Sequence, residues 1–147
     1  MAAKLTLDAA QVVIAAARQE AEKFGQPVDI AIVDDGNNLL AFARMDGAML
    51  GSIDVALNKA YTARAFNMRT EELTPLAQPG QPLYGLEASN RGRVILFGGG
   101  VPLQVDGVVV GAVGVSGGSV PQDQEVALAG ATAFEDLVRE RQPTSAR

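Results

Sequence analysis

Arg44 is the residue best suited to bind an acidic small molecule. It ends a predicted apolar strand and is followed by Met45, Asp46 and Gly47. A guanidinium at the end of a strand can hold a carboxylate through two parallel hydrogen bonds. We therefore predict Arg44 and Met45 as ligand-binding residues. The alternative is a structural ion pair between Arg44 and Asp46 or another acid.

A run of three glycines forms a second candidate for ligand binding. Gly98, Gly99 and Gly100 precede Val101 and Pro102, between two predicted strands. Glycines allow backbone amides to face a ligand, and we predict that Pro102 belongs to the same wall. A phosphate loop is disfavoured, because no Lys-Ser or Lys-Thr pair follows and the next element is a strand. A plain loop or bulge is the alternative.

A third candidate is the segment that leads into the last predicted helix. It contains Ser116, Gly117, Gly118 and Ser119. The first turn of a helix binds anions through backbone amides that lack partners inside the helix, and the two serines add hydroxyls. The alternative is an ordinary capped helix start with flexible glycines.

Acid–base chemistry would rest on carboxylates or lysine, because the chain has neither histidine nor cysteine. Ser-His-Asp and Cys-His mechanisms are therefore excluded, as are disulfides and thiolate metal sites. The candidates are Asp46, Lys59 and Asp123. A buried Lys59 could act as a base or form a Schiff base, because burial lowers its pKa, whereas a solvated lysine is the alternative. Asp34 and Asp35 fit a turn better than a metal site, so no metal site is predicted.

The elements that must position these residues alternate between helices and closely spaced strands. Helical periodicity predicts helices over residues 5–24 and 50–67, a short one capped by Thr70, and a last one capped by Ser119 or Val120. Short apolar runs separated by turn signals predict strands over residues 28–33, 39–44, 94–97, 101–105 and 108–115. Adjacent strands joined by short turns predict one five-stranded antiparallel sheet, covered by helices in an α+β fold.

The apolar positions of the second helix predict which of its sides is buried. These positions keep helical spacing: Leu50, Ile53, Leu57, Ala60 and Tyr61. Lys59 and Thr62 then lie on the more polar side of the helix. Residues 78–93 are irregular, with Tyr84 and Leu86 as apolar anchors. A loop this long is typically functional or mobile; a surface loop or an oligomer contact is the alternative.

The bulk composition limits the class of protein. A length of 147 residues fits one domain, with a polar tail over residues 140–147. The net charge of −5 and the 5% aromatic content argue against a nucleic-acid partner. The absence of cysteine, of a secretory signal pattern and of a long apolar window predicts a cytoplasmic protein without a membrane partner.

Five motifs together resemble one known family. They are VDDGNNL (33–39), FARMDGA (42–48), KAYTA (59–63), FGGGVP (97–102) and GAVGVSGG (111–118), in that order. The chain is similar to the GlcG/HbpS-like family, whose domain (DUF336) is also described as haem-degrading. The resemblance covers residues 5 to about 138.

The resemblance implies a profilin-like α-β-α fold with a five-stranded antiparallel sheet. It also implies a homo-oligomer, from a dimer to an octamer, and haem or another tetrapyrrole as the ligand. Because histidine is absent, the iron ligands left to consider are Met45, Tyr61, Thr62 and Tyr84.

Two functions from different classes follow. In the first, the protein is a non-catalytic accessory protein that binds a haem-like or small acidic ligand. In the second, it is a small enzyme acting on a hydroxy- or oxo-acid. There Arg44 would clamp the carboxylate, and Asp46, Asp123 or Lys59 would move the proton.

Overall fold

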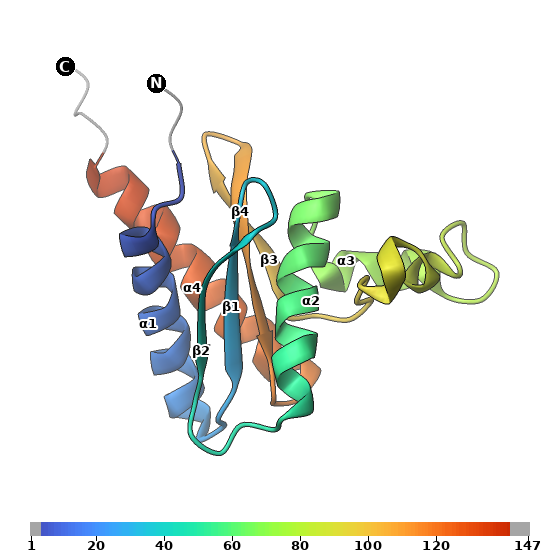
Figure 1. The fold of residues 1–147 in the computed structure, drawn as a ribbon, viewed down its shortest axis with the longest axis horizontal. Coiled ribbons are helices and arrows are strands. Elements are labelled where there is room, and N and C mark those ends of the chain that lie inside the picture. Colours follow the sequence, from blue (N-terminus) through green and yellow to red (C-terminus); the bar gives the residue numbers. More distant parts are fainter. Residues whose placement is uncertain (1–3, 142–147) are drawn as a thin grey trace.

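The computed structural model describes residues 4–141. In this range the chain forms four α-helices and four β-strands (Figure 1), with three single 3₁₀ turns after α3. In chain order the elements are α1 (Leu7–Phe24), β1 (Asp29–Asp34), β2 (Leu39–Arg44), α2 (Gly51–Phe66), α3 (Thr70–Leu73), β3 (Gly100–Val105), β4 (Val108–Ser116) and α4 (Val120–Arg141).

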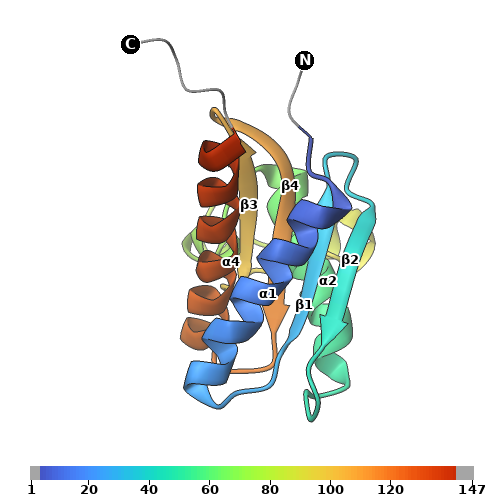
Figure 2. The ribbon, with the colours of Figure 1, turned by 90° about the vertical axis from the view of Figure 1, so that its left-hand side faces the viewer.

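The strands form one antiparallel sheet in the order β2-β1-β4-β3. Helices α1 and α4 cover one face and α2 covers the other (Figures 1 and 2). Side chains alternate between the faces along β1: Ile30 and Ile32 pack with α1 and α4, whereas Ala31 and Val33 pack against α2. The α+β class is therefore confirmed.

The number of strands was predicted wrongly, because residues 94–97 form no strand. Side chains form hydrogen bonds with the backbone groups that a neighbouring strand would otherwise bind. The Ile95 amide donates to Thr62 Oγ1 at 3.0 Å, and Thr74 Oγ1 donates to the Leu96 carbonyl. This segment instead leads into the glycine run that starts β3.

Caps mark both ends of α1, which ends at residue 24 as predicted and starts two residues later than predicted. Thr6 Oγ1 accepts from the Ala9 amide at 3.1 Å and starts α1, and Gly25 ends it in the left-handed conformation with φ of 66°. Thr70, however, does not cap α3, because it lies inside the helix and accepts from the Gly100 amide. Of the predicted polar tail over residues 140–147, residues 140–141 belong to α4, and 142–147 lie outside the described residues.

Helix α2 is buried mainly through small residues and Lys59; of the apolar positions predicted to face the core, Ala60 is fully buried and Leu57 is partly buried. Leu50 is 73% exposed, and the buried side chains are Ser52, Ala56, Lys59, Ala60, Thr62 and Ala63. Small residues let the helix axis approach the sheet closely. A Cβ on Gly114 would lie 2.2 Å from the Ala56 carbonyl oxygen. This short approach brings Lys59 into the interior.

Residues 75–93, which we call the arm, project from the α2 side of the sheet (Figure 1). Tyr84 is 66% exposed there, and Leu76 and Leu83 are also exposed. Arg93 anchors the end of the arm, because its guanidinium stacks 3.9 Å from the centre of the Tyr61 ring on α2. Across the described residues, every helix is too short or too polar to span a membrane.

Candidate functional site

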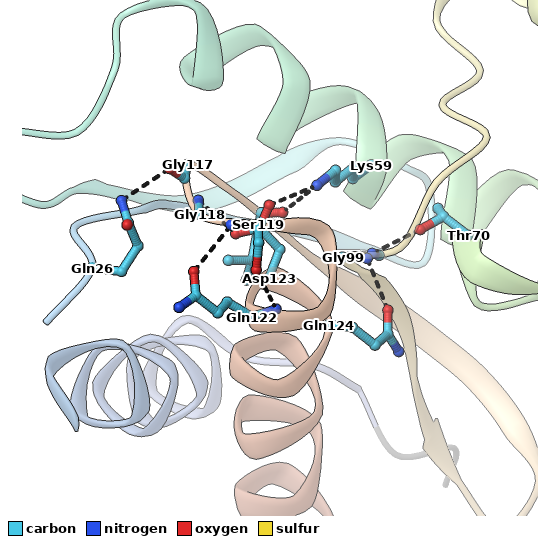
Figure 3. Close-up of polar contacts among 12 residues, drawn as sticks. Gln26, Lys59, Thr70, Gly99, Gly117, Gly118, Ser119, Gln122, Asp123 and Gln124 are labelled. Carbon is cyan, nitrogen blue, oxygen red and sulfur yellow. Dashed lines mark hydrogen bonds and ion pairs between the residues drawn. The ribbon is translucent and has the colours of Figure 1, made fainter. Parts of the chain in front are cut away.

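The ammonium group of Lys59 lies at the centre of a buried polar cluster. Its side chain is fully buried, and Nζ donates to the Val115 carbonyl at 2.8 Å. Nζ also lies 3.2 Å from Asp123 Oδ2, in an ion pair that joins α2 to α4 (Figure 3). The Phe97 ring centre is 5.0 Å away, within the range of a cation–π contact.

Asp123 connects the ion pair to the start of α4. Its Oδ1 accepts from the Gly118 amide at 2.9 Å, while Oδ2 faces Lys59. Ser119 and Gln122 complete the helix start by bonding each other's backbone amides, a reciprocal pattern known as a capping box. The amides of Gly118 and Ser119 are thus already bonded inside the protein (Figure 3).

Gly99 and Gly100 are glycines because the Lys59 cluster leaves no room for a side chain. A Cβ on Gly99, whose φ is 126°, would lie 2.6 Å from Lys59 Nζ, and one on Gly100 would lie 2.5 Å from the Lys59 carbonyl oxygen. Their amides are also occupied. Gly99 donates to Gln124 Oε1 at 2.8 Å, and Gly100 donates to Thr70 Oγ1 at 2.9 Å.

The predicted site residues therefore separate into two regions. Those near the Lys59 cluster are Gly98, Gly99, Gly100, Ser116, Gly117, Gly118, Ser119 and Asp123. Pro102 is buried on β3, an outer strand of the sheet. Arg44, Met45 and Asp46 lie at the other edge, where they line a recess of about 390 Å³ with Arg18, Glu22 and Ala43.

The Lys59 cluster has the geometry of an internal brace. Its cation is bonded to two protein acceptors and is closed to solvent. A Schiff base would require a carbonyl compound to reach Nζ, and Nζ is enclosed by protein. Catalytic roles for Asp46, Lys59 and Asp123 stay predictions, as do the ligand contacts of the glycines and serines.

A second polar group crosses the sheet at the Arg44 edge. Asp29 on β1 pairs with Arg44 on β2 and with Ser116 on β4, so the three side chains form a row on the α2 face. Asp29 is fully buried. Among the described residues, neither of its carboxylate oxygens has a hydrogen-bond partner.

Burial shifts the pKa of Lys59 and of Asp29 in the direction that favours the neutral form of each. It lowers the pKa of Lys59 from 10.5, and the adjacent Asp123 carboxylate opposes that change. It raises the pKa of Asp29 from 3.8, against the opposing charge of Arg44. The two groups differ in their partners: Lys59 has a close counter-ion, whereas Asp29 has only an arginine in its row.

This arrangement can be compared with known proteins. The family described as "Haem degrading protein HbpS-like" matches residues 5–132. The chain belongs to the HbpS-like family. The match spans both the Lys59 cluster and the Arg44 edge, so the recognised resemblance is confirmed.

Its relatives in this family differ in length. A 15.0 kDa protein of the dhaT-dhaS intergenic region of Citrobacter freundii is 44% identical over 92% of this chain and 95% of its own. The corrinoid adenosyltransferase PduO of the same organism is 46% identical over 76% of this chain but 33% of that enzyme. The solved PduOC:Heme complex is 39% identical, with a TM-score of 0.86 over 89% of this chain and 95% of that one.

Asp29 is the site residue that sequence reasoning missed. It stands between Val28 and Ile30 in a run that was read only for its apolar positions. The alternation of a strand places Asp29 on the same face as Ala31, which is buried. That periodicity was the available signal for a buried carboxylate.

We expect alkaline pH to stabilise this HbpS-like protein through Lys59. Because the folded pKa is below 10.5, the unfolded chain binds more protons between the two values, and the free energy of unfolding rises with pH there. Urea unfolding in steps up to pH 10.5 should show this rise in the wild type and not in Lys59→Met. Parallel curves for the two proteins would contradict the expectation.

Proposed function

We propose that this protein is an oligomeric accessory protein that binds a haem-like tetrapyrrole. The observation that carries the proposal is its similarity to a haem complex: PduOC is 39% identical over 89% of this chain. Membership of the HbpS-like family and the corrinoid adenosyltransferase relative support the same ligand class. Haem and corrinoids are both large, mostly flat tetrapyrroles.

The described residues fit haem if a tyrosine binds the iron. Thr62 is buried and bonds within the protein, and the Tyr61 hydroxyl is bonded to Asn90 and Arg93. Met45 is only half-buried. Tyr84 is the more exposed of the two tyrosines, and among the described residues its hydroxyl makes no hydrogen bond. Tyrosine is one of the side chains that hold haem iron in proteins.

The arm could also supply contacts for the rest of a porphyrin. Leu83 and Leu76 are exposed apolar side chains on the arm that carries Tyr84, and Arg91 is an exposed cation on it. Apolar side chains suit the porphyrin face, and a guanidinium suits its carboxylates. Bound haem would supply the iron and its absorption band, and this chain would supply the surface and the oxygen ligand.

Haemin titration tests the proposal with the two tyrosines as a matched pair. We expect saturable binding to the wild type and to Tyr61→Phe, with light scattering giving a mass of at least two chains of 15.3 kDa. In Tyr84→Phe we expect the phenolate–iron absorption to disappear and the affinity to fall about tenfold, or 1.4 kcal/mol. Absence of saturable binding to the wild type contradicts the proposed function. Equal losses of haemin affinity in both variants contradict Tyr84 as the iron ligand.

A further inference from the structure

Asp29 is the one described carboxylate that is buried without a partner on either oxygen. A buried polar group without a hydrogen bond destabilises the fold, and a charged one does so more strongly. Native proteins contain few such groups, and those that persist point to a functional site or a bound molecule. The side chain therefore suggests a ligand that donates hydrogen bonds.

The neighbours of Asp29 in the sheet come from two strands, one on each side of β1. Arg44 and Ser116 flank it in the row on the α2 face, each about 5 Å away across the strand spacing. Arg44 is exposed and Ser116 is buried. A ligand over this row would thus meet a cation, an acceptor and a hydroxyl in line.

Helix α2 begins over the same row. Ala31 and Gly114 lie next to Ala56, and Asp29 is two residues farther along β1. Two residues along a strand cover about 7 Å, the same distance as four or five residues along a helix. The residue of α2 nearest to Asp29 is therefore expected at Ser52, four residues before Ala56. Ser52 is buried in the first turn of α2, and Leu50 gives this helix no side-chain cap. A helix start favours an anion.

We propose that Arg44, Asp29 and the first turn of α2 bind a short carboxylic acid that carries a hydroxyl or ammonium group on the carbon next to the carboxylate. The carboxylate would pair with Arg44 and the helix start, and the donor group would reach Asp29. Side chains directly opposite in neighbouring strands have Cβ atoms about 5 Å apart, so one small acid would reach both Arg44 and Asp29. This site is separate from the arm and goes beyond the proposed function.

The entrance would lie at the connection between β2 and α2. In Figure 1 this connection passes the end of the sheet where β1 starts. It includes Gly47, with φ of 86°, and the exposed residues Met49 and Leu50. The recess beside Arg44 lies on the other face, because Arg18 and Glu22 of α1 line it. Because Asp29 is enclosed, the acid would have to displace part of this connection.

Three acids of similar size test the proposal: L-lactate, L-alanine and propionate, which carry a hydroxyl, an ammonium or neither. We expect lactate or alanine, at a hundred times its Kd, to raise the Tm by about 5–10 °C. Propionate should give a clearly smaller shift, because it leaves Asp29 unpaired. A propionate shift as large as both others, or no shift with any acid, would overturn the proposal.

Two substitutions locate the site, and a third serves as the control. Asp29→Asn and Arg44→Gln should abolish the shift, whereas Arg18→Gln, in the same recess, should retain it. Asp29→Asn should fold with an unchanged or higher Tm at neutral pH, because it removes a carboxyl that ionises without a partner. A shift that survives in both Asp29→Asn and Arg44→Gln places the acid elsewhere and refutes the site.

The pH dependence of stability and a haemin titration provide separate readouts. The raised folded pKa makes the stability of the wild type fall as pH rises from 3.8 through that value, and Asp29→Asn should lack this fall. The other charged groups near this end are Arg44 on β2 and Asp54 in the first turn of α2. Asp29→Asn retains both of them, and Arg44→Gln replaces only Arg44. Haemin affinity should stay unchanged in Asp29→Asn, so failure of this site is distinguishable from failure of the tetrapyrrole proposal.

Discussion

Replacing Lys59 with methionine is expected to lower the free energy of unfolding by about 3–5 kcal/mol. The methionine fills most of the same space but leaves Asp123 buried without its counter-ion. It also leaves the Val115 carbonyl without the Lys59 hydrogen bond. Urea unfolding followed by circular dichroism measures the change, which corresponds to a fall in Tm of roughly 10 °C.

Two further variants separate the ion pair from packing. Lys23→Met is the matched control, because Lys23 is 69% exposed and, within residues 4–141, pairs only with Glu20 on its own helix; its effect should stay within about 0.5 kcal/mol. Adding Asp123→Asn to Lys59→Met should restore part of the loss, because no unpaired charge then remains. A loss below about 1 kcal/mol in Lys59→Met would show that the pair does not brace the fold.

Gly114→Ala is expected to destabilise the protein by at least about 3 kcal/mol, at the upper end of overpacking effects. The new methyl group would lie 2.2 Å from the Ala56 carbonyl oxygen and 2.4 Å from the Ala60 nitrogen. Both are backbone atoms of α2, so no side-chain rotation can relieve the clash. The helix would have to move away from the sheet, and denaturant unfolding or the soluble yield would report it.

Gly51→Ala provides the contrast within the same helix. An added Cβ there meets no atom within 4 Å, and alanine favours helix over glycine by up to about 1 kcal/mol. We therefore expect Gly51→Ala to be neutral or stabilising. If Gly114→Ala unfolds at the same urea concentration as the wild type, α2 is not held at the distance described.

The sequence predicted the hairpins and helices well because each carries its own local signals. The β1–β2 and β3–β4 turns contain Asp-Gly pairs, and Thr6 and Gly25 mark the ends of α1. Residues 94–97, which were predicted as a strand and form none, carry an equally apolar pattern. Its backbone partners come from Thr62 and Thr74, and such distant side-chain contacts leave no mark in a local pattern.

The candidate site was predicted less well, because burial of polar residues depends on the distance between elements. The large apolar residues of α2 suggested one buried side, but Ala56, Ala60 and Gly114 let the adjacent side, which carries Lys59, approach the sheet. Lys59 thereby became buried. Arg44 was predicted as a carboxylate clamp, whereas the strand register was needed to place Asp29 beside it.

The bonds of Lys59 also fix where this protein can move. They attach the middle of α2 to β4 and to α4, so the helix cannot tilt off the sheet without breaking a buried ion pair. Ser52 is seven residues before Lys59, or about 10 Å along the helix. About two turns of α2, together with the connection from β2, precede that anchor. A molecule that reaches Asp29 would therefore displace the start of α2 and the connection from β2, while the rest of the sheet and its helices stay in place.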